Sequence, residues 1–67
     1  MIDVSKYQLT ENLWVYSATA NDHTVEHLST DPNLQLVAQA FSDSHSWGVA
    51  LYDVGSGDRV ATRFSFR

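Results

Sequence analysis

Apolar and polar residues alternate along four stretches of the chain, which predicts four antiparallel strands paired as two hairpins. The first hairpin is expected over residues 4–20, with a two-residue turn in its middle. Its register sets Leu9 opposite Trp14 and Tyr7 opposite Tyr16, so that the aromatic side chains share one face. That face is expected to be half of a buried core.

The second hairpin is expected over residues 47–67, around the Gly- and Ser-containing turn at residues 55–58. Glycine, serine and aspartate supply the backbone conformations and local hydrogen bonds of a tight turn. The register that buries the most apolar surface pairs Val49 with Phe64, because a slip by one residue sets the apolar row against arginines.

A helical middle is expected between the hairpins. Asp31-Pro32 has the features of a helix start, and the apolar residues from Leu34 to Phe41 recur at helical spacing. Residues 22–29 have two interpretations. A short helix is favoured, and a third strand that returns from a turn at Asn21-Asp22 is the alternative.

These elements predict an α+β fold, with a small antiparallel four-stranded sheet flanking a helical middle in the order ββ-α(α)-ββ. Residues 1–67 are expected to form a single compact domain. The residues expected to be buried are Tyr7, Leu9, Trp14, Tyr16, Leu34, Val37, Phe41, Trp47, Val49, Leu51, Phe64 and Phe66.

Composition excludes several chemistries. The 67 residues include no cysteine, so disulfides, thiolate metal sites and thiol nucleophiles are absent. No apolar run approaches the roughly 20 residues of a membrane span. We therefore expect a cytoplasmic protein that does not contact a membrane.

Three short patterns could carry chemistry, and none does so convincingly. The string His23-Thr24-Val25-Glu26-His27 would place two histidines on one side of a helix, as in some zinc peptidases, yet no glutamate follows Glu26 to act as a third ligand. The acids that flank the turn at 55–58 are better explained as turn caps, and the serines around His45 as a polar loop. We expect no catalytic residue, no metal and no cofactor, and hence not an enzyme.

Charge is distributed unevenly along the chain. Residues 1–58 carry eight acids against one lysine, a net charge of −7, whereas residues 59–67 carry three arginines and no acid. Arginine and tyrosine are frequent binding hot spots, so the expected partner-binding residues are Tyr52, Arg59, Arg63 and Arg67. The ordinary interpretation is a solvated edge that arginine protects from pairing. The acidic surface expected to steer a partner comprises Asp22, Glu26, Asp31 and Asp43.

The small, acidic, cysteine-free chain resembles the inhibitors that phages make against host enzymes, anti-CRISPR proteins among them. Its segment 47–53 is similar to the last hairpin of the phage inhibitors of uracil-DNA glycosylase, whose Glu-Ser-Ile segment is absent here. The resemblance implies a non-enzymatic protein-binding module that blocks a host protein, with nucleic-acid-binding host complexes among the candidate partners. Direct nucleic-acid binding is not expected, because the net charge of −4 repels phosphate.

Two alternative functions remain for this chain. A self-associating subunit would complete its thin core as a homodimer, through its sheet. More remotely, the histidines of residues 23–27 would form a metal site.

Overall fold

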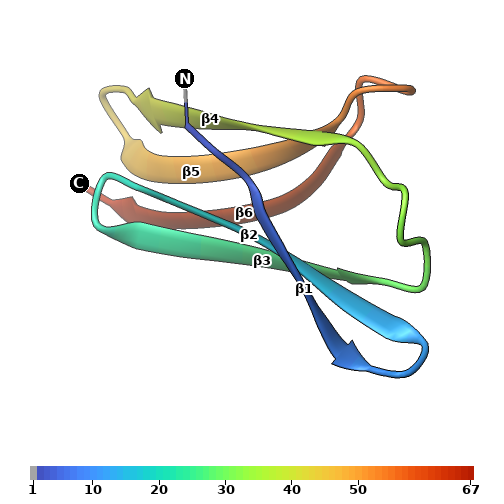
Figure 1. Cartoon of the computed structure of the whole chain (residues 1–67). Coiled ribbons are helices and arrows are strands. Elements are labelled where there is room, and N and C mark those ends of the chain that lie inside the picture. Colours follow the sequence, from blue (N-terminus) through green and yellow to red (C-terminus); the bar gives the residue numbers. More distant parts are fainter. Residues whose placement is uncertain (1) are drawn as a thin grey trace.

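Residues 2–67, which the computed structural model describes, form six strands and no helix. Consecutive strands pair in antiparallel fashion within two sheets, an N-terminal sheet of order β1-β2-β3 and a C-terminal sheet of order β4-β5-β6 (Figure 1). The strands are β1 (Ser5–Thr10), β2 (Leu13–Ala20), β3 (His23–Ser29), β4 (Leu36–Ser42), β5 (Ser46–Asp53) and β6 (Arg59–Phe66). The predicted α+β fold, with one four-stranded sheet and a helical middle, is therefore wrong.

Residues 22–29, which were expected to form a short helix, instead contain the strand β3, as the alternative prediction had it. Asn21 and Asp22 have φ angles of 51° and 60°, and this pair of left-handed residues closes the tight turn of the β2–β3 hairpin. Asparagine and aspartate tolerate that conformation better than most residues. Val25 is buried while its neighbours in β3 point to solvent, as a period of two requires.

The predicted helix start at Asp31-Pro32 lies in the loop between the two sheets. The Asp31 carboxylate accepts a hydrogen bond from the backbone N–H of Asn33 at 2.8 Å. An aspartate accepts this type of bond equally well in a turn and at a helix N-terminus, so the signal did not distinguish the two. The residues that follow alternate as β4, with Leu36 and Ala38 packed against the core.

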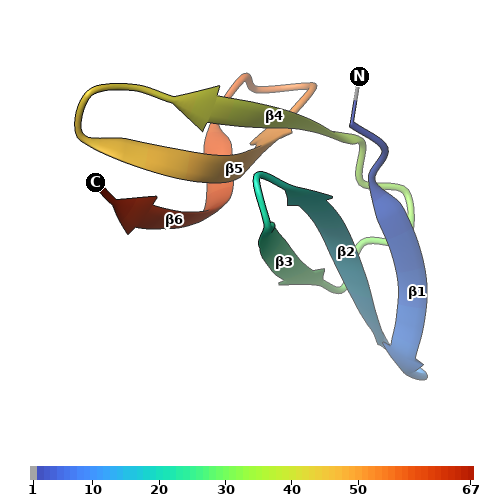
Figure 2. The ribbon, with the colours of Figure 1, turned by 90° about the vertical axis from the view of Figure 1, so that its left-hand side faces the viewer.

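The core lies between the two sheets, where the β2–β3 hairpin packs against the C-terminal sheet (Figure 2). Strand β1 stands away from the C-terminal sheet and contacts β2 alone among the described strands. The molecule is accordingly elongated, with principal extents of 41 × 22 × 18 Å. The buried hydrophobic residues are Val15, Tyr16, Ala18, Val25, Val49, Ala50 and Leu51, and Gly48 is buried as well.

The register of the β5–β6 hairpin differs by one residue from the prediction, which is wrong here. Val49 lies opposite Arg63, and Gly48 lies opposite Phe64, with an irregularity between Leu51 and Tyr52. An arginine can occupy this row because β6 is an edge strand, from which a long side chain reaches solvent. The phenylalanines of β6 consequently lie on the outer face of the sheet.

The first hairpin also departs from its predicted register. Gln8, and not Leu9, lies opposite Trp14, and the pairing is irregular around Leu9. Tyr7 pairs with Val15 on the outer face, where it is 48% exposed. The inner side of this hairpin end carries Lys6, whose ammonium group lies 5.0 Å from the centre of the Trp14 ring.

These register changes explain the errors in the predicted core. Only Tyr16, Val49 and Leu51 of the predicted set are buried. The half-buried members are Trp14, Leu34, Phe41 and Trp47, and the exposed ones are Tyr7, Leu9, Val37, Phe64 and Phe66. A thin core of mainly small and aliphatic residues, which also contains Tyr16, takes the place of the predicted aromatic one.

Polar contacts join the two sheets at the β2–β3 turn. The side-chain amide of Asn21 donates to the backbone oxygens of Phe41 at 3.0 Å and Gly48 at 3.2 Å. His23 contacts the Ser65 hydroxyl through Nε2 at 2.7 Å and packs edge-on to Trp47, with ring centres 4.5 Å apart. These contacts fix the position of the N-terminal sheet relative to β4, β5 and β6.

Candidate functional site

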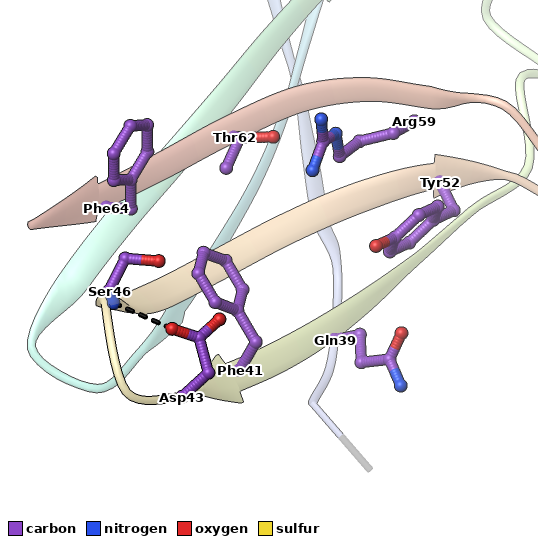
Figure 3. A pocket seen from close by; sticks show the side chains of 8 residues that line it. All are labelled: Gln39, Phe41, Asp43, Ser46, Tyr52, Arg59, Thr62 and Phe64. Carbon is purple, nitrogen blue, oxygen red and sulfur yellow. Dashed lines mark hydrogen bonds between the residues drawn. The ribbon is translucent and has the colours of Figure 1, made fainter.

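A hollow of about 430 Å³ lies on the outer face of the C-terminal sheet (Figure 3). All three strands and the β4–β5 loop contribute to it. Its lining residues are Gln39, Phe41, Asp43, Ser46, Tyr52, Arg59, Thr62 and Phe64. We call this feature the outer groove.

The outer groove exists because the middle strand carries small residues between larger ones. Across the sheet, Gly48 lies between Phe41 and Phe64. One row further along β5, Ala50 lies between Gln39 and Thr62 in the same way. Side chains on one face of a sheet stand side by side, so a small residue in the central strand leaves space between its neighbours.

Gly48 is required by the backbone as well as by the groove. A Cβ atom at this position would lie 2.1 Å from the Arg63 carbonyl oxygen and 2.7 Å from the Phe64 Cα. Both are backbone atoms, so no side-chain rotation could relieve the overlap. Glycine therefore allows β6 to approach β5 closely at the aromatic end of the groove.

The aromatic walls differ in how they are supported. Phe41 is half-buried in the edge strand β4. Phe64 is 45% exposed and packs edge-to-face against Phe66, with ring centres 5.1 Å apart. Phe66 itself is 78% exposed. Large apolar area therefore remains uncovered on this face, an arrangement typical of interaction surfaces.

The two ends of the outer groove have opposite charge. Tyr52 and Arg59 are paired across β5 and β6 and lie together at one end, where the Arg59 guanidinium is directed toward Thr62 (Figure 3). Asp43 lies at the other end, beside Ser46. The groove thus combines an apolar middle with one cationic and one anionic end.

The carboxylate of Asp43 is held ionised by the loop that carries it. Its Oδ1 atom accepts hydrogen bonds from the backbone N–H groups of His45 and Ser46, each at 2.8 Å. These two bonds, with a smaller contribution from the charge of Arg67, hold the pKa of Asp43 below its ordinary value, against a small opposing effect of burial. The loop bonds therefore hold the Asp43 carboxylate in place and favour its charged form.

The structure separates the four residues predicted to bind a partner. Tyr52 and Arg59 line the outer groove. Arg63 lies instead in a second hollow of about 580 Å³, together with Asp22 and Glu26. Arg67 is engaged within the chain, since its guanidinium donates to the Asp43 carbonyl oxygen at 2.6 Å and to the Ser42 hydroxyl.

The four residues of the predicted acidic surface are also dispersed. Asp22 and Glu26 belong to the β2–β3 hairpin, on the side of Arg63. Asp31 lies in the loop between the sheets, where its backbone oxygen accepts a hydrogen bond of 2.5 Å from the buried Tyr16 hydroxyl. Only Asp43 lines the outer groove.

The histidine pattern of residues 23–27 lies on a strand, which separates its members. His23 and His27 are four residues apart in β3, about 13 Å at the rise of an extended strand. One metal ion cannot bind both side chains at that separation. Within residues 2–67 the structure contains no group of three or more potential metal ligands.

The prediction missed five groove residues, of which the two phenylalanines were assigned to the core: Gln39, Phe41, Ser46, Thr62 and Phe64. The available signal was in β5, where alternate residues share one face of the strand and three of these, Ser46, Gly48 and Ala50, are small. A run of small residues in a central strand indicates a depression in that face, whichever face is buried.

Comparison of the chain with protein-family models, with curated proteins and with solved structures found no match. Residues 2–67 contain no helix of the length and apolar character needed to cross a membrane.

Proposed function

We propose that this chain is a protein-binding module, and that the outer groove is its contact surface. The observation that carries the proposal is an uncovered groove whose walls are Phe41 and Phe64 and whose end combines Tyr52 with Arg59. Aromatic residues and arginine are enriched at the centres of protein interfaces, where they supply contact area and directed hydrogen bonds. The role is binding and not catalysis.

The partner we propose is a protein with a basic surface around the segment that enters the groove. The chain carries a net charge of −4, and acids such as Asp22 and Glu26 are exposed on its surface. Long-range attraction between opposite charges raises the rate of encounter and makes it dependent on salt. An inhibitory role fits such a module, since a protein that covers a surface blocks it, and we place the encounter in the cytoplasm.

The test starts from a random peptide display library selected against the immobilised chain. Enriched peptides are then measured by fluorescence anisotropy against wild type, Phe64→Ala and Tyr7→Ala. The two variants are matched, because Phe64 is 45% and Tyr7 48% exposed, on the outer faces of different sheets. We expect Phe64→Ala to weaken binding roughly tenfold or more and Tyr7→Ala to leave it unchanged.

Circular dichroism confirms that both variants fold before their binding is compared. Recovery of no peptide above background would contradict the proposal. Peptides that lose affinity for Tyr7→Ala while retaining it for Phe64→Ala would move the contact surface to the N-terminal sheet.

Self-association is the second candidate function, and a different face favours it. Tyr7, Leu9 and Leu28 are each about half exposed on the N-terminal sheet. Light scattering of wild type and Leu28→Lys at low and high concentration separates the two functions. We expect the monomer mass for both, whereas a wild-type dimer that Leu28→Lys dissociates would favour self-association.

A further inference from the structure

We infer that the outer groove binds an extended segment of the partner that carries three groups in a fixed order. A basic group lies beside Asp43, a flat apolar side chain lies between Phe41 and Phe64, and a carboxylate lies beside Arg59. The inference deepens the proposed function and rests on it. It follows from the spacing of the groove walls, the charge of its ends and the way the sheet edge is covered.

The space between the phenylalanines fits one ring. Phe41 and Phe64 lie on either side of Gly48, so their backbones are separated by two strand spacings, roughly 9.5 Å. Aromatic pairs prefer ring centres about 4.5–7 Å apart, so a ring placed midway would contact both walls at favourable distance. Phe66 supports one wall through its edge-to-face contact with Phe64.

The charged ends are available to a ligand. Arg59 is exposed and lines the groove. In contrast, Arg67 is already held by the β4–β5 loop. Asp43 uses Oδ1 for its loop bonds and faces the groove from the opposite end (Figure 3). An arginine and a carboxylate at opposite ends select a ligand of the reverse polarity.

The positions along β5 set the spacing of the three groups. Gly48 lies two residues from Ser46 at the acidic end and four residues from Tyr52 at the basic end. At the rise of an extended chain these intervals are about 7 Å and 13 Å. The ligand segment therefore carries its basic residue about two positions from the apolar one, and its acid about four positions away on the other side.

The segment lies on the face of the sheet and does not extend it. The outer edge of β4 is engaged at Ala38 by a bridge to Ile2. An added strand needs free backbone groups along such an edge. Because this bridge interrupts the edge of β4, we expect the segment to lie across the face of the sheet.

The experiment uses synthetic peptides of the type Lys-x-Trp-x-x-x-Glu, made in both chain directions, with small polar residues at x. Charge-reversed peptides and peptides with Ala in place of Trp are their controls. We expect the designed peptides to bind wild type roughly fivefold or more tightly than the charge-reversed ones, and the Ala peptides to bind least. Arg59→Glu should shift the preference to peptides with Lys at both ends.

Arg63→Glu is the matched control, because it changes the net charge equally outside the outer groove. An equal change of preference in Arg63→Glu and Arg59→Glu would overturn the inference, since it would show a long-range effect of charge. The inference would also be overturned if the designed peptides bound without a charge preference, or if they did not bind while library peptides bound the groove. Either result would leave the proposed function standing. A twelve-nucleotide oligo(dT) that binds the groove more tightly than the peptides would overturn both.

Discussion

Both sheets carry a row of three residues on their outer faces, and the middle residue makes the two faces different. In the N-terminal sheet the row is Tyr7, Val15 and Leu28. In the C-terminal sheet it is Phe41, Gly48 and Phe64. The flanking residues are large and apolar in both rows. Valine places a side chain between its neighbours, whereas glycine places none between the two phenylalanines.

The comparison shows that a groove in a sheet can arise from one strand without any change of topology. Val15 is 3% exposed although it lies on an outer face. Gly48 and Ala50 are equally buried, yet the side chains flanking them border a hollow of about 430 Å³. Residue size in the central strand therefore decides whether such a row is a flat patch or a groove.

Gly48→Val, which copies the row of the N-terminal sheet into the C-terminal one, should have the largest effect. The added side chain meets the backbone of Arg63 and Phe64, so we expect a loss of about 3–5 kcal/mol in the free energy of unfolding. Urea unfolding followed by tryptophan fluorescence measures it. Gly55→Ala is the control, since a Cβ there meets only the Asp53 carboxylate at 3.3 Å. A tolerated Gly48→Val would mean that β5 and β6 are less close than described.

The reciprocal change, Val15→Gly, opens a space in the N-terminal sheet. We expect a loss of about 2–3 kcal/mol, from the buried valine side chain and the lower strand preference of glycine. The same urea titration measures it, with Leu28→Ala as a partly exposed control that should cost about 1 kcal/mol or less. Equal losses of stability for the two variants would show that Tyr7 and Leu28 do not pack against Val15.

The contact between the two sheets can be tested at Asn21. Asn21→Gly suits the φ of 51° but removes the hydrogen bonds to Phe41 and Gly48, and we expect a loss of about 1 kcal/mol. Asn21→Ala also strains the backbone and should lose up to about 1 kcal/mol more. Thermal unfolding of both variants separates the contribution of the hydrogen bonds to stability from that of the turn conformation. An unchanged stability of Asn21→Gly would show that the amide does not join the sheets.

The smallest expected effect is on the pH dependence of the free energy of unfolding. Because the folded state lowers the pKa of Asp43, this carboxylate stabilises the fold above its ordinary pKa, and the contribution is lost as the pH falls through its folded pKa. Wild type should therefore lose more stability than Asp43→Asn on acidification from pH 7 toward pH 2. Urea unfolding across that range measures the difference, and parallel profiles would contradict the role of the loop bonds.

The sequence predicted the two outer hairpins and their turns, because alternation and turn residues are local signals. It did not predict β3 and β4 as strands. The signals at Asp31-Pro32 and around Leu34 suit a helix and an extended segment alike, and the choice depends on packing against the other sheet.

The candidate site was predicted only in part, for a related reason. Tyr52 and Arg59 share the outer groove as expected from their strand positions. Arg63 was grouped with them, but the one-residue shift in register moved it to the side of Asp22 and Glu26. Register in a thin fold depends on long-range packing, which a count of apolar pairs within one hairpin does not contain.

The most direct test of the central claim is an NMR titration of the ¹⁵N-labelled chain with the tightest peptide of the display selection. Our account predicts that the largest amide shifts occur at the C-terminal sheet, at Gln39, Phe41, Tyr52, Thr62 and Phe64. The amides of Tyr7, Val15 and Leu28 should stay unchanged. Shifts concentrated at those three residues, with the outer groove unaffected, would contradict the account.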